Sequence, residues 1–257
     1  MRTAGIVLAG GRSTRMGRPK ATLDWHGSTL VRRAVGIVGR VVDGPVVVVR
    51  AHGQELPALP ADVEIAQDAR EARGPLQGIA AGLEAIGDRA DAVFVCGVDA
   101  PLLHPALVRH VIASLADDDD VVLPQAHGFP HPLAAAYRTT VAQHLHDLLD
   151  EDRLGTRPLL QRCRVRCLDE AALLADRTVA QLDPELHSLA NLNEPAEYDA
   201  ARERPAPEVA VAGRGTVRAA TLGAAGEGPA TVNGRAVSDP EEPLVAGDEV
   251  AFVMRRR

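Results

Sequence analysis

The sequence predicts an α/β protein with a mostly parallel sheet flanked by helices, followed by a small β-rich module. Three observations support this fold class. Short aliphatic runs alternate with amphipathic segments, which is the pattern of βαβ units. Hydrophobic residues make up 46% of the chain but aromatic residues only 2%, so the core must be aliphatic, as in parallel strands covered by helices. Residues 208–257 change to short β-prone pieces separated by glycine turns.

The first predicted strand, residues 4–8, is an apolar run. The first helix is expected over residues 28–40, because apolar residues recur there at helical spacing behind a Ser/Thr start signal. The run over residues 92–96 is continuously apolar and is therefore expected near the centre of the sheet. The same reasoning gives strands at residues 45–49, 63–66, 121–123, 131–137 and 164–168, and helices at residues 76–86, 107–115, 140–149, 170–175 and 195–202.

A glycine-rich, basic loop over residues 8–20, LAGGRSTRMGRPK, joins the first strand to the first helix. Gly10 and Gly11 have no Cβ, so a ligand can approach their amides, and successive amides in such a turn form an anion-binding concavity. The cations around it are Arg12, Arg15, Arg18 and Lys20. The spacing matches neither a P-loop nor a dinucleotide fingerprint. The pattern predicts a polyphosphate pocket; the alternative is a tight surface loop that is merely basic.

Composition excludes several classes of protein. The net charge of −7 argues against broad binding of nucleic acid or of an anionic membrane, so a basic loop here suits a small anionic ligand. No apolar run approaches membrane-spanning length and no signal peptide precedes the first strand, so we expect a soluble, cytoplasmic protein. Cys96, Cys163 and Cys167 form neither a disulfide framework nor a zinc-binding pattern.

Two aspartates follow predicted strands. The carboxyl ends of parallel strands meet at one edge of a sheet, so we expect Asp68, Asp99 and the basic loop to converge there. Mg²⁺ takes only one or two protein carboxylates, and Asp99, before Pro101, is the best candidate; the alternative is a turn residue. Lys20 is the candidate for neutralising phosphate charge in the transition state, with Arg15 as a second contact.

The string over residues 8–20 resembles the signature of the molybdenum cofactor guanylyltransferase family. The resemblance covers about residues 3–202 and implies a Rossmann-like domain that uses Mg²⁺ to join GMP from GTP to molybdopterin, releasing pyrophosphate. It implies catalytic roles for Lys20, Arg15 and Asp99, with Asp99 as the metal ligand. The residues implied in GTP binding are Leu8, Ala9, Gly10, Gly11, Lys20, Asp68, Gly74, Pro75, Leu76, Gly78 and Asp99.

The resemblance also implies an acceptor site. In the family, the residues that approach the pterin match His131, which precedes Pro-Leu, and also Asn191 and Asn193. The alternative is that His131 is an ordinary loop residue and that the two asparagines cap the last helix. Gly10 favours guanine, because cytidylyl relatives tend to have alanine there. Against this, the family's asparagine after the second strand is absent, and Arg-Ala-His occupies residues 50–52.

We expect a nucleotidyltransferase domain over residues 1–203, a linker over 204–208 and a module over 209–257. In the module, strands are expected near 209–211, 230–232 and 249–254, a short helix over 216–222, and a hairpin turn at Asn233-Gly234. The module resembles a shortened molybdopterin sulfur-carrier β-grasp. It ends in three arginines instead of the carrier's Gly-Gly, which favours a docking or vestigial role; a generic β appendage is the alternative.

These observations predict a Mg²⁺-dependent guanylyltransferase with GTP and molybdopterin or the molybdenum cofactor as substrates. Its candidate partners are other cofactor-biosynthesis proteins or molybdoenzymes. The alternatives are a cytidylyltransferase for the same cofactor, a nucleotidyltransferase for another phosphorylated metabolite, and a non-catalytic nucleotide-binding scaffold. We expect deletion of residues 208–257 to leave nucleotide binding intact.

Overall fold

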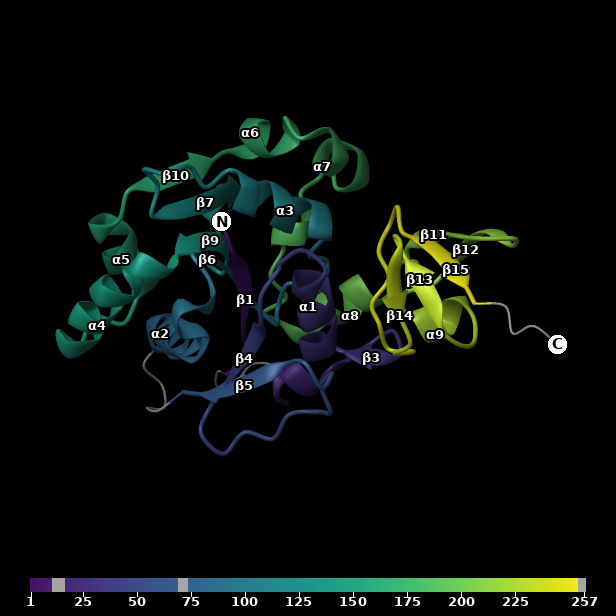
Figure 1. The fold of residues 1–257 in the computed structure, drawn as a ribbon, viewed down its shortest axis with the longest axis horizontal. Helices are drawn as coiled ribbons and strands as arrows, with labels where there is room; N and C mark the ends of the chain where they lie inside the picture. Colours follow the sequence, from purple (N-terminus) through teal and green to yellow (C-terminus); the bar gives the residue numbers. More distant parts are fainter. Residues whose placement is uncertain (11–16, 69–73, 254–257) are drawn as a thin grey trace.

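The computed structural model describes residues 1–10, 17–68 and 74–253. A large sheet stands between two layers of helices, and a small sheet lies beside helix α1 (Leu30–Gly39) (Figure 1). The predicted α/β architecture is confirmed. The loop residues Gly11, Arg12 and Arg15, to which the sequence assigns anion binding, lie outside the described residues.

The large sheet has the strand order β10-β7-β9-β6-β1-β4-β5, with β8 paired to β7. Strands β6, β1, β4 and β5 run parallel, and Ile6 of β1 lies in register with Val95 and Val47. Strand β9 runs antiparallel between β6 and β7. The bounds are β1 Thr3–Leu8, β4 Val46–Arg50, β5 Glu64–Gln67, β6 Ala92–Gly97, β7 Val121–Ala126, β8 Phe129–Pro130, β9 Ala134–Arg138 and β10 Val165–Leu168. The predicted central position of residues 92–96 is confirmed, and four parallel strands end at one edge.

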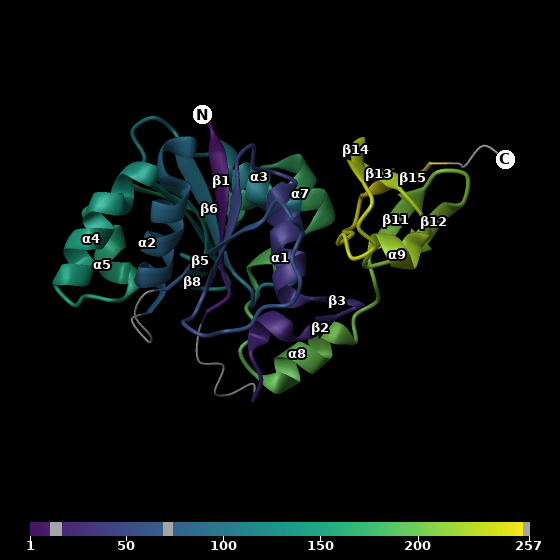
Figure 2. The ribbon, with the colours of Figure 1, turned by 60° about the horizontal axis from the view of Figure 1, so that its bottom comes forward.

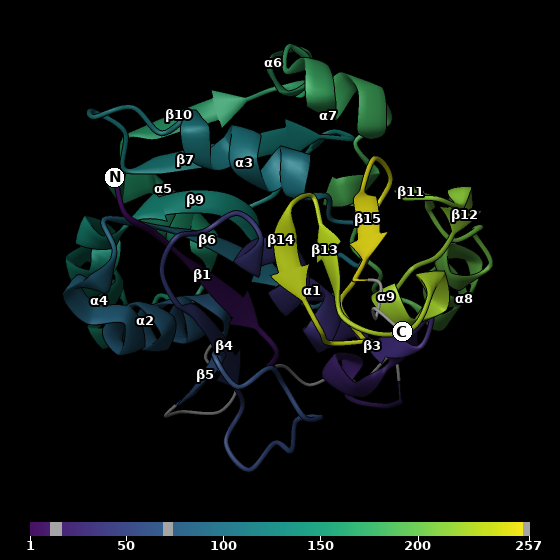
Figure 3. The same cartoon turned by 45° about the vertical axis from the view of Figure 1, so that its right-hand side comes forward.

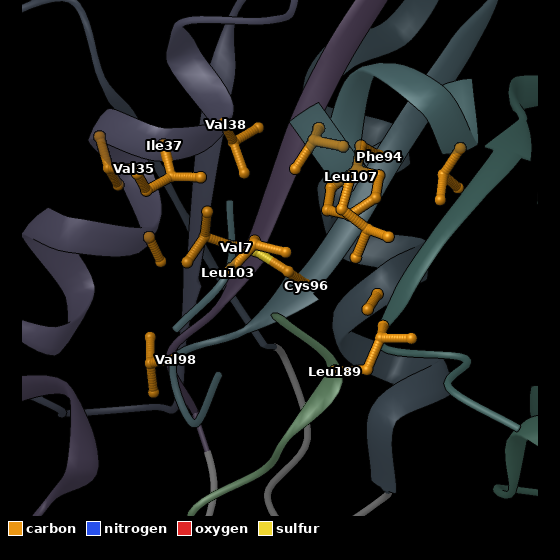
Figure 4. Packing of buried hydrophobic residues seen from close by; sticks show 14 of the residues in the cluster. Val7, Val35, Ile37, Val38, Phe94, Cys96, Val98, Leu103, Leu107 and Leu189 are labelled. Carbon is orange, nitrogen blue, oxygen red and sulfur yellow. The ribbon is translucent and has the colours of Figure 1, made fainter. Parts of the chain in front are cut away.

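The helices cover both faces of this sheet. Helices α1 and α3 (Pro105–Ala113) pack on one face, and α2 (Gly74–Ile86) packs on the other, with α4 (Ala142–Asp150) and α5 (Thr156–Arg162) outside it (Figure 2). Successive strand residues point to opposite faces, so each face has its own core. Val7, Val38, Phe94 and Leu107 pack together on the α1 side (Figure 4), and Ile6, Val95 and Leu76 on the α2 side.

Local chemistry explains where α1 and α3 begin. Thr29 caps α1 by accepting the N–H of Arg32, as the Ser/Thr signal predicts. His104 caps α3, because its Nδ1 accepts the N–H of Ala106 at 3.1 Å. Before α1 lies a small hairpin of β2 (Asp24–Trp25) and β3 (Ser28–Thr29), which the sequence analysis did not predict.

The remaining elements are short. Helices α5 and α7 (Arg177–Leu182) were not predicted, because each buries only one residue fully, Leu159 and Val179, and so has no apolar stripe. The other short elements are α6 Glu170–Leu174, α8 Pro195–Arg202 and the 3₁₀ turns η1 Lys20–Thr22, η2 Gly87–Arg89, η3 Thr139–Val141 and η4 His187–Leu189. Within the described chain, no helix is long and apolar enough to cross a membrane.

The small sheet has the order β12-β11-β15-β13-β14. Its elements are β11 Glu208–Val211, β12 Gly215–Arg218, α9 Leu222–Ala225, β13 Ala230–Val232, β14 Arg235–Val237 and β15 Glu249–Phe252. The three predicted strands are confirmed, and so is the Asn233-Gly234 turn, where φ is 51° and 81°. The helix predicted over 216–222 is wrong. Gly213 and Gly215, both at positive φ, turn the chain back so that β12 pairs with β11.

The C-terminal module, residues 208–253, docks along one side of α1 (Figure 3). Positions 32, 36 and 40 are four residues apart and therefore lie on the same face of the helix. Arg40 pairs with Glu242 at 3.2 Å and Asp248 at 2.8 Å, and these side chains are at most 10% exposed. Arg32 pairs with Asp239 and with Glu241, and Gly36 lies against the ring of Pro243. The contact is therefore an ionic clamp around a close glycine–proline approach.

Candidate nucleotide-binding site

Three residues from distant parts of the sequence meet at the carboxyl edge of the large sheet. The Nζ of Lys20 lies 3.4 Å from Oδ2 of Asp99 and donates to Oδ1 of Asn193 at 3.0 Å. The Lys20 and Asp99 side chains are 16% and 24% exposed, so a ligand can reach them while water screens them only partly. The structure thus brings together a predicted phosphate ligand, a predicted metal ligand and a predicted acceptor contact.

Lys20 is the only lysine of the chain; all the other long basic side chains are arginines. An ammonium is a compact point charge on a flexible stem, whereas a guanidinium is a broad planar fork. Lys20 opens η1 directly after Pro19, and its backbone carbonyl accepts the N–H of Leu23 at 3.1 Å. The short 3₁₀ turn therefore holds the backbone of Lys20, and the flexible side chain carries the ammonium from there.

Backbone contacts hold Asp99 in place. The N–H of Val98 donates to the carbonyl of Leu8 at 3.3 Å, and the carbonyl of Asp99 accepts the N–H of Leu192 at 2.8 Å. An ideal Cβ on Gly97 would lie 2.4 Å from Oδ1 of Asp99, so a larger residue there would displace this carboxylate from its present position. The backbone that carries the carboxylate is therefore held jointly by the ends of β1 and β6 and by the segment before α8.

Asn193 does not cap α8, contrary to one alternative from the sequence. The cap is Glu194, and the carboxylate of Glu197 accepts the N–H of Asn193 at 2.7 Å and of Glu194 at 3.0 Å. These backbone bonds hold the pKa of Glu197 below its ordinary value. The side chain of Asn193 is thereby left to accept from Lys20, and Asn191 is exposed two residues earlier.

At the start of the basic loop, the structure shows what the Gly10 amide contacts within the fold, and its predicted contact with a nucleotide stays a prediction. The N–H groups of Ala9 and Gly10 both donate to the carbonyl of Val49, at 2.9 and 3.2 Å. The Gly10 amide is therefore engaged within the fold and is not presented to a phosphate in this conformation. An ideal Cβ on Gly10 would lie 3.0 Å from the Ala51 nitrogen, so the glycine permits a close approach of two backbones. Leu8 and Ala9 are buried beneath it.

Gln54 lies beside the loop although the sequence analysis did not single it out. Its Nε2 donates to the carbonyl of Ala9 at 3.0 Å, and its Oε1 accepts the N–H of Ala51 at 2.9 Å. Arg50 donates to the carbonyl of Gln54 at 2.9 Å, and Asp68, at the end of β5, donates its N–H to the Arg50 carbonyl at 2.8 Å. A carboxamide thus stands in the region where the family's asparagine is missing. A lone glutamine in a loop gives no sequence signal.

The Gly-Pro-Leu-x-Gly motif forms the first turns of α2. Gly74 has φ +69°, and a Cβ there would lie 2.8 Å from the carbonyl oxygen of Leu154. Leu76 is fully buried, and a Cβ on Gly78 would lie 3.0 Å from the Leu8 side chain. The structure gives Leu76 and Gly78 a packing role that seats α2 on β1. Gly74 and the half-buried Pro75 lie at the start of the helix.

His131 lies at the same edge but faces its own hairpin. Its N–H donates to Pro124 at 2.9 Å, and its Nε2 contacts the carbonyl of Ala126 at 3.1 Å. Burial lowers the pKa of its imidazole. The carbonyl of Leu133 accepts the N–H of Gly97 at 3.4 Å, so this segment borders the end of β6. The predicted acceptor contact of His131 stays a prediction.

Residues 5–167 match the family model described as MobA-like NTP transferase domain. The chain belongs to this family. A relative named probable molybdenum cofactor guanylyltransferase, from Mycobacterium ulcerans, is 40% identical over 186 residues, which cover 70% of this chain and 90% of that one. The transferase domain therefore contains the basic loop, Asp68 and Asp99, whereas Asn193 and the C-terminal module lie beyond the matched residues.

Solved structures have the same fold. Molybdopterin-guanine dinucleotide biosynthesis protein A from Archaeoglobus fulgidus superposes with a TM-score of 0.60 at 22% identity, covering 78% of this chain and 97% of that one. A Mycobacterium tuberculosis protein solved in complex with manganese superposes with a TM-score of 0.52 at 18% identity, covering 66% and 88% of the two chains.

The residues of the transferase domain fit a divalent metal that is bound mainly by substrate. Among the described residues, no group of three or more His, Cys, Asp or Glu side chains is placed to hold a metal ion. Asp99 offers one carboxylate, in a space that the missing Cβ of Gly97 leaves open. Mg²⁺ is commonly held by one or two carboxylates, with waters and phosphate oxygens completing its octahedron. A single carboxylate beside a lysine that the sequence predicts to bind phosphate matches that donor set.

Proposed function

We propose that this protein transfers GMP from GTP to molybdopterin or the molybdenum cofactor and releases pyrophosphate. The observation that carries the proposal is the meeting of Lys20, Asp99 and Asn193 at the carboxyl edge of a MobA-like sheet. The name of the Mycobacterium ulcerans relative supports the substrate pair. The proposed residues for GTP, metal and acceptor are those that the sequence implies, with Gly10, Leu76 and Gly78 acting through packing.

The contact between Lys20 and Asp99 suggests how the site accepts its charged substrate. Without nucleotide, each of the two charges compensates the other. When the triphosphate binds, the Lys20 ammonium would donate to a phosphate oxygen, and the Asp99 carboxylate would be available to hold a divalent metal. A bound Mg²⁺ would polarise the phosphate oxygens and stabilise the charge that develops at the α-phosphorus. Lys20 contributes a further fixed positive charge, which is worth most where it matches the transition state.

Asn193 joins the nucleotide side of the site to the acceptor side. Its Oδ1 accepts from Lys20, while the backbone that carries it is tied to Asp99 through Leu192. A pterin held near Asn191 and Asn193 would therefore lie beside the α-phosphate. Effective molarity from such alignment supplies much of the rate in a reaction that needs little covalent help from the protein.

Product analysis tests the proposal directly. The protein is incubated with molybdopterin, Mg²⁺ and each NTP in turn, and the products are identified by mass spectrometry. We expect a guanine dinucleotide and pyrophosphate with GTP. Turnover with CTP but not GTP would favour the cytidylyltransferase alternative instead. Substitutions Asp99→Asn and Lys20→Ala should each lower kcat/KM by about 10²-fold or more, the usual effect of removing one charge-stabilising group.

Two matched variants make the test specific. Asp91→Asn removes a carboxylate just before the opposite end of β6, where Asp91 pairs with Arg2 on the surface, and should leave turnover unchanged. Lys20→Arg keeps the charge but not its compact shape, and it should not restore the activity. If Asp99→Asn and Lys20→Ala leave pyrophosphate release intact, the catalytic assignment is wrong and the scaffold alternative gains.

A further inference from the structure

A cavity of about 360 Å³ lies between the transferase domain and the C-terminal module. Trp25, Arg33 and His104 contribute from the transferase domain, Arg204 from the segment before the module, and Val245 and Ala246 from the module. None of the residues assigned to the nucleotide or the acceptor lines it. Cavities of this size, mostly apolar with a few polar groups, are typical of small-ligand sites.

Arg33 is the unusual residue of this cavity. It is 7% exposed, its Nε donates to the carbonyl of Pro101, and its guanidinium lies 5.9 Å from the centre of the Trp25 ring. Among the described residues, no carboxylate lies within ion-pair distance of it, and its two terminal nitrogens have no hydrogen-bond acceptor. Arginine is almost never buried without a partner. These terminal nitrogens are not among the fully enclosed, unpartnered atoms of the described residues, so solvent reaches them from the cavity and an anion could do the same.

A second arginine of α1 gives an internal comparison. Arg40 is buried to a similar degree, but it has two carboxylates, Glu242 and Asp248, within 3.2 Å. The pKa of Arg33 is lowered to about 10, mainly by burial. Repulsion from Arg40 also lowers this pKa, and attraction by Asp248 raises it by a smaller amount. The positive charge of Arg40 is therefore balanced by carboxylates, whereas among the described residues Arg33 has no carboxylate within ion-pair distance.

The rim of the cavity also leaves positive charge available. Arg204 is exposed and has no ion-pair partner among the described residues. Two acids also line the cavity, and their hydrogen bonds do not cancel their charge: Asp183 accepts the N–H groups of His187 and Ser188 at 2.7 and 3.0 Å, and Glu185 lies 3.3 Å from the His187 ring. Arg33 inside and Arg204 outside are the cations that remain to receive an anion.

We propose that this cavity binds a small organic molecule through one phosphate or carboxylate group held by Arg33. A guanidinium fork matches both oxyanions with paired hydrogen bonds. The apolar body of the ligand lies along Trp25 and Val245, and Arg204 contacts it from the rim. Both the transferase domain and the module line the cavity, so a bound ligand holds the two together. The site is separate from the proposed nucleotide site and does not depend on it.

Trp25 allows a direct test, because it is the only tryptophan of the chain. The full-length protein is titrated with phosphate, pyrophosphate and acetate at constant ionic strength, with chloride as the reference, while indole fluorescence is recorded. We expect a saturable change with phosphate or acetate, and the stronger of the two identifies the preferred oxyanion. The absence of a saturable change with all three probes overturns the proposal.

Variants separate this cavity from the nucleotide site. Arg33→Met keeps the length and packing of the side chain and should weaken binding by about tenfold or more, as the loss of a charge-assisted hydrogen bond implies. Lys20→Ala should leave the titration unchanged. Loss of the signal in Lys20→Ala with retention in Arg33→Met would place the anion at the nucleotide site and refute the proposal.

A rim variant covers the case in which Arg33→Met does not fold, as circular dichroism would reveal. Arg204→Gln changes an exposed side chain and should fold normally. We expect it to weaken the anion by about two- to fivefold, because an exposed charge contributes modestly. Unchanged affinity in Arg204→Gln, when Arg33→Met is unfolded, also overturns the proposal.

Discussion

Substitution of Gly36 by alanine should loosen the C-terminal module. An ideal Cβ on Gly36 would lie 2.5 Å from Cδ and 2.6 Å from Cγ of Pro243, whereas carbon atoms in favourable contact are about 3.5–4 Å apart. The proline ring cannot rotate away, so helix and module must separate by about 1 Å. Arg32 and Arg40, one turn away on either side, hold the module at its present distance through their ion pairs.

The size of the effect follows from two opposing terms. Overpacking of a fitted contact costs about 1–3 kcal/mol. Alanine in place of glycine in a helix contributes up to about 1 kcal/mol in the other direction. Gly39→Ala is the matched control, because a Cβ there would lie 3.6 Å from Val46, an ordinary contact. It receives the helix-forming gain without the clash, so the two variants should differ by about 1–3 kcal/mol.

Thermal unfolding of the two variants measures this difference. For a chain of this size, about 1 kcal/mol corresponds to roughly 2–4 °C, so Gly36→Ala should melt roughly 2–12 °C below Gly39→Ala. Limited proteolysis within residues 204–208 should also be faster in Gly36→Ala, because separation exposes the linker. If Gly36→Ala is as stable as Gly39→Ala, the glycine–proline contact does not hold the module and the reasoning fails.

Three further predictions concern the junction between the transferase domain and the module. Arg40→Met leaves the buried Asp248 without its ion-pair partner, whereas Glu242 keeps Arg235, and should cost about 3–5 kcal/mol in urea unfolding; a loss below about 1 kcal/mol would contradict the clamp. Burial lowers the pKa of His104 below its ordinary value of 6.5, so the unfolded chain takes up its proton first, and stability should fall as the pH drops below that value. The Nδ1 of His104 accepts the N–H of Ala106, and its Nε2 contacts the Ala246 carbonyl. The variant His104→Asn should therefore lose part of this acid sensitivity when its melting temperature is measured between neutral and acidic pH. An unchanged pH profile would refute the assignment to His104. Deletion of residues 208–257 should change the dissociation constant of GTP, measured by calorimetry, by less than about threefold, because changes at sites far from each other act independently. A large loss of affinity would show that the module contacts the nucleotide.

The elements that the sequence predicts well are those whose signal is local. Continuous aliphatic runs identify β1, β4 and β6, and the capped amphipathic pattern identifies α1. The meeting of Lys20 with Asp99 follows from the rule that parallel strands end at one edge. Their encounter with Asn193 follows only from the family resemblance, because 173 residues separate Asn193 from Lys20.

The features that escape prediction depend on long-range placement. A buried strand has the same composition in either direction, so the antiparallel course of β9 has no local signature. The Gly10 amide is expected to face a ligand, but neighbouring β4 supplies an acceptor at Val49. Gln54 and Arg33 are single polar residues without a pattern. Their surroundings exist only after segments from far along the chain have folded against them.

The two sides of α1 carry independent tasks. One side packs Val31, Val35 and Val38 in the hydrophobic core of the transferase domain, and the other presents positions 32, 36 and 40 to the module. Changes at these three module-facing positions are therefore expected to weaken the attachment of the module without altering the core face of the helix. For protein engineering, this face of α1 is a docking surface. A different small domain that presents a proline flanked by acidic residues at matching intervals could be attached to it without changes to the transferase sheet.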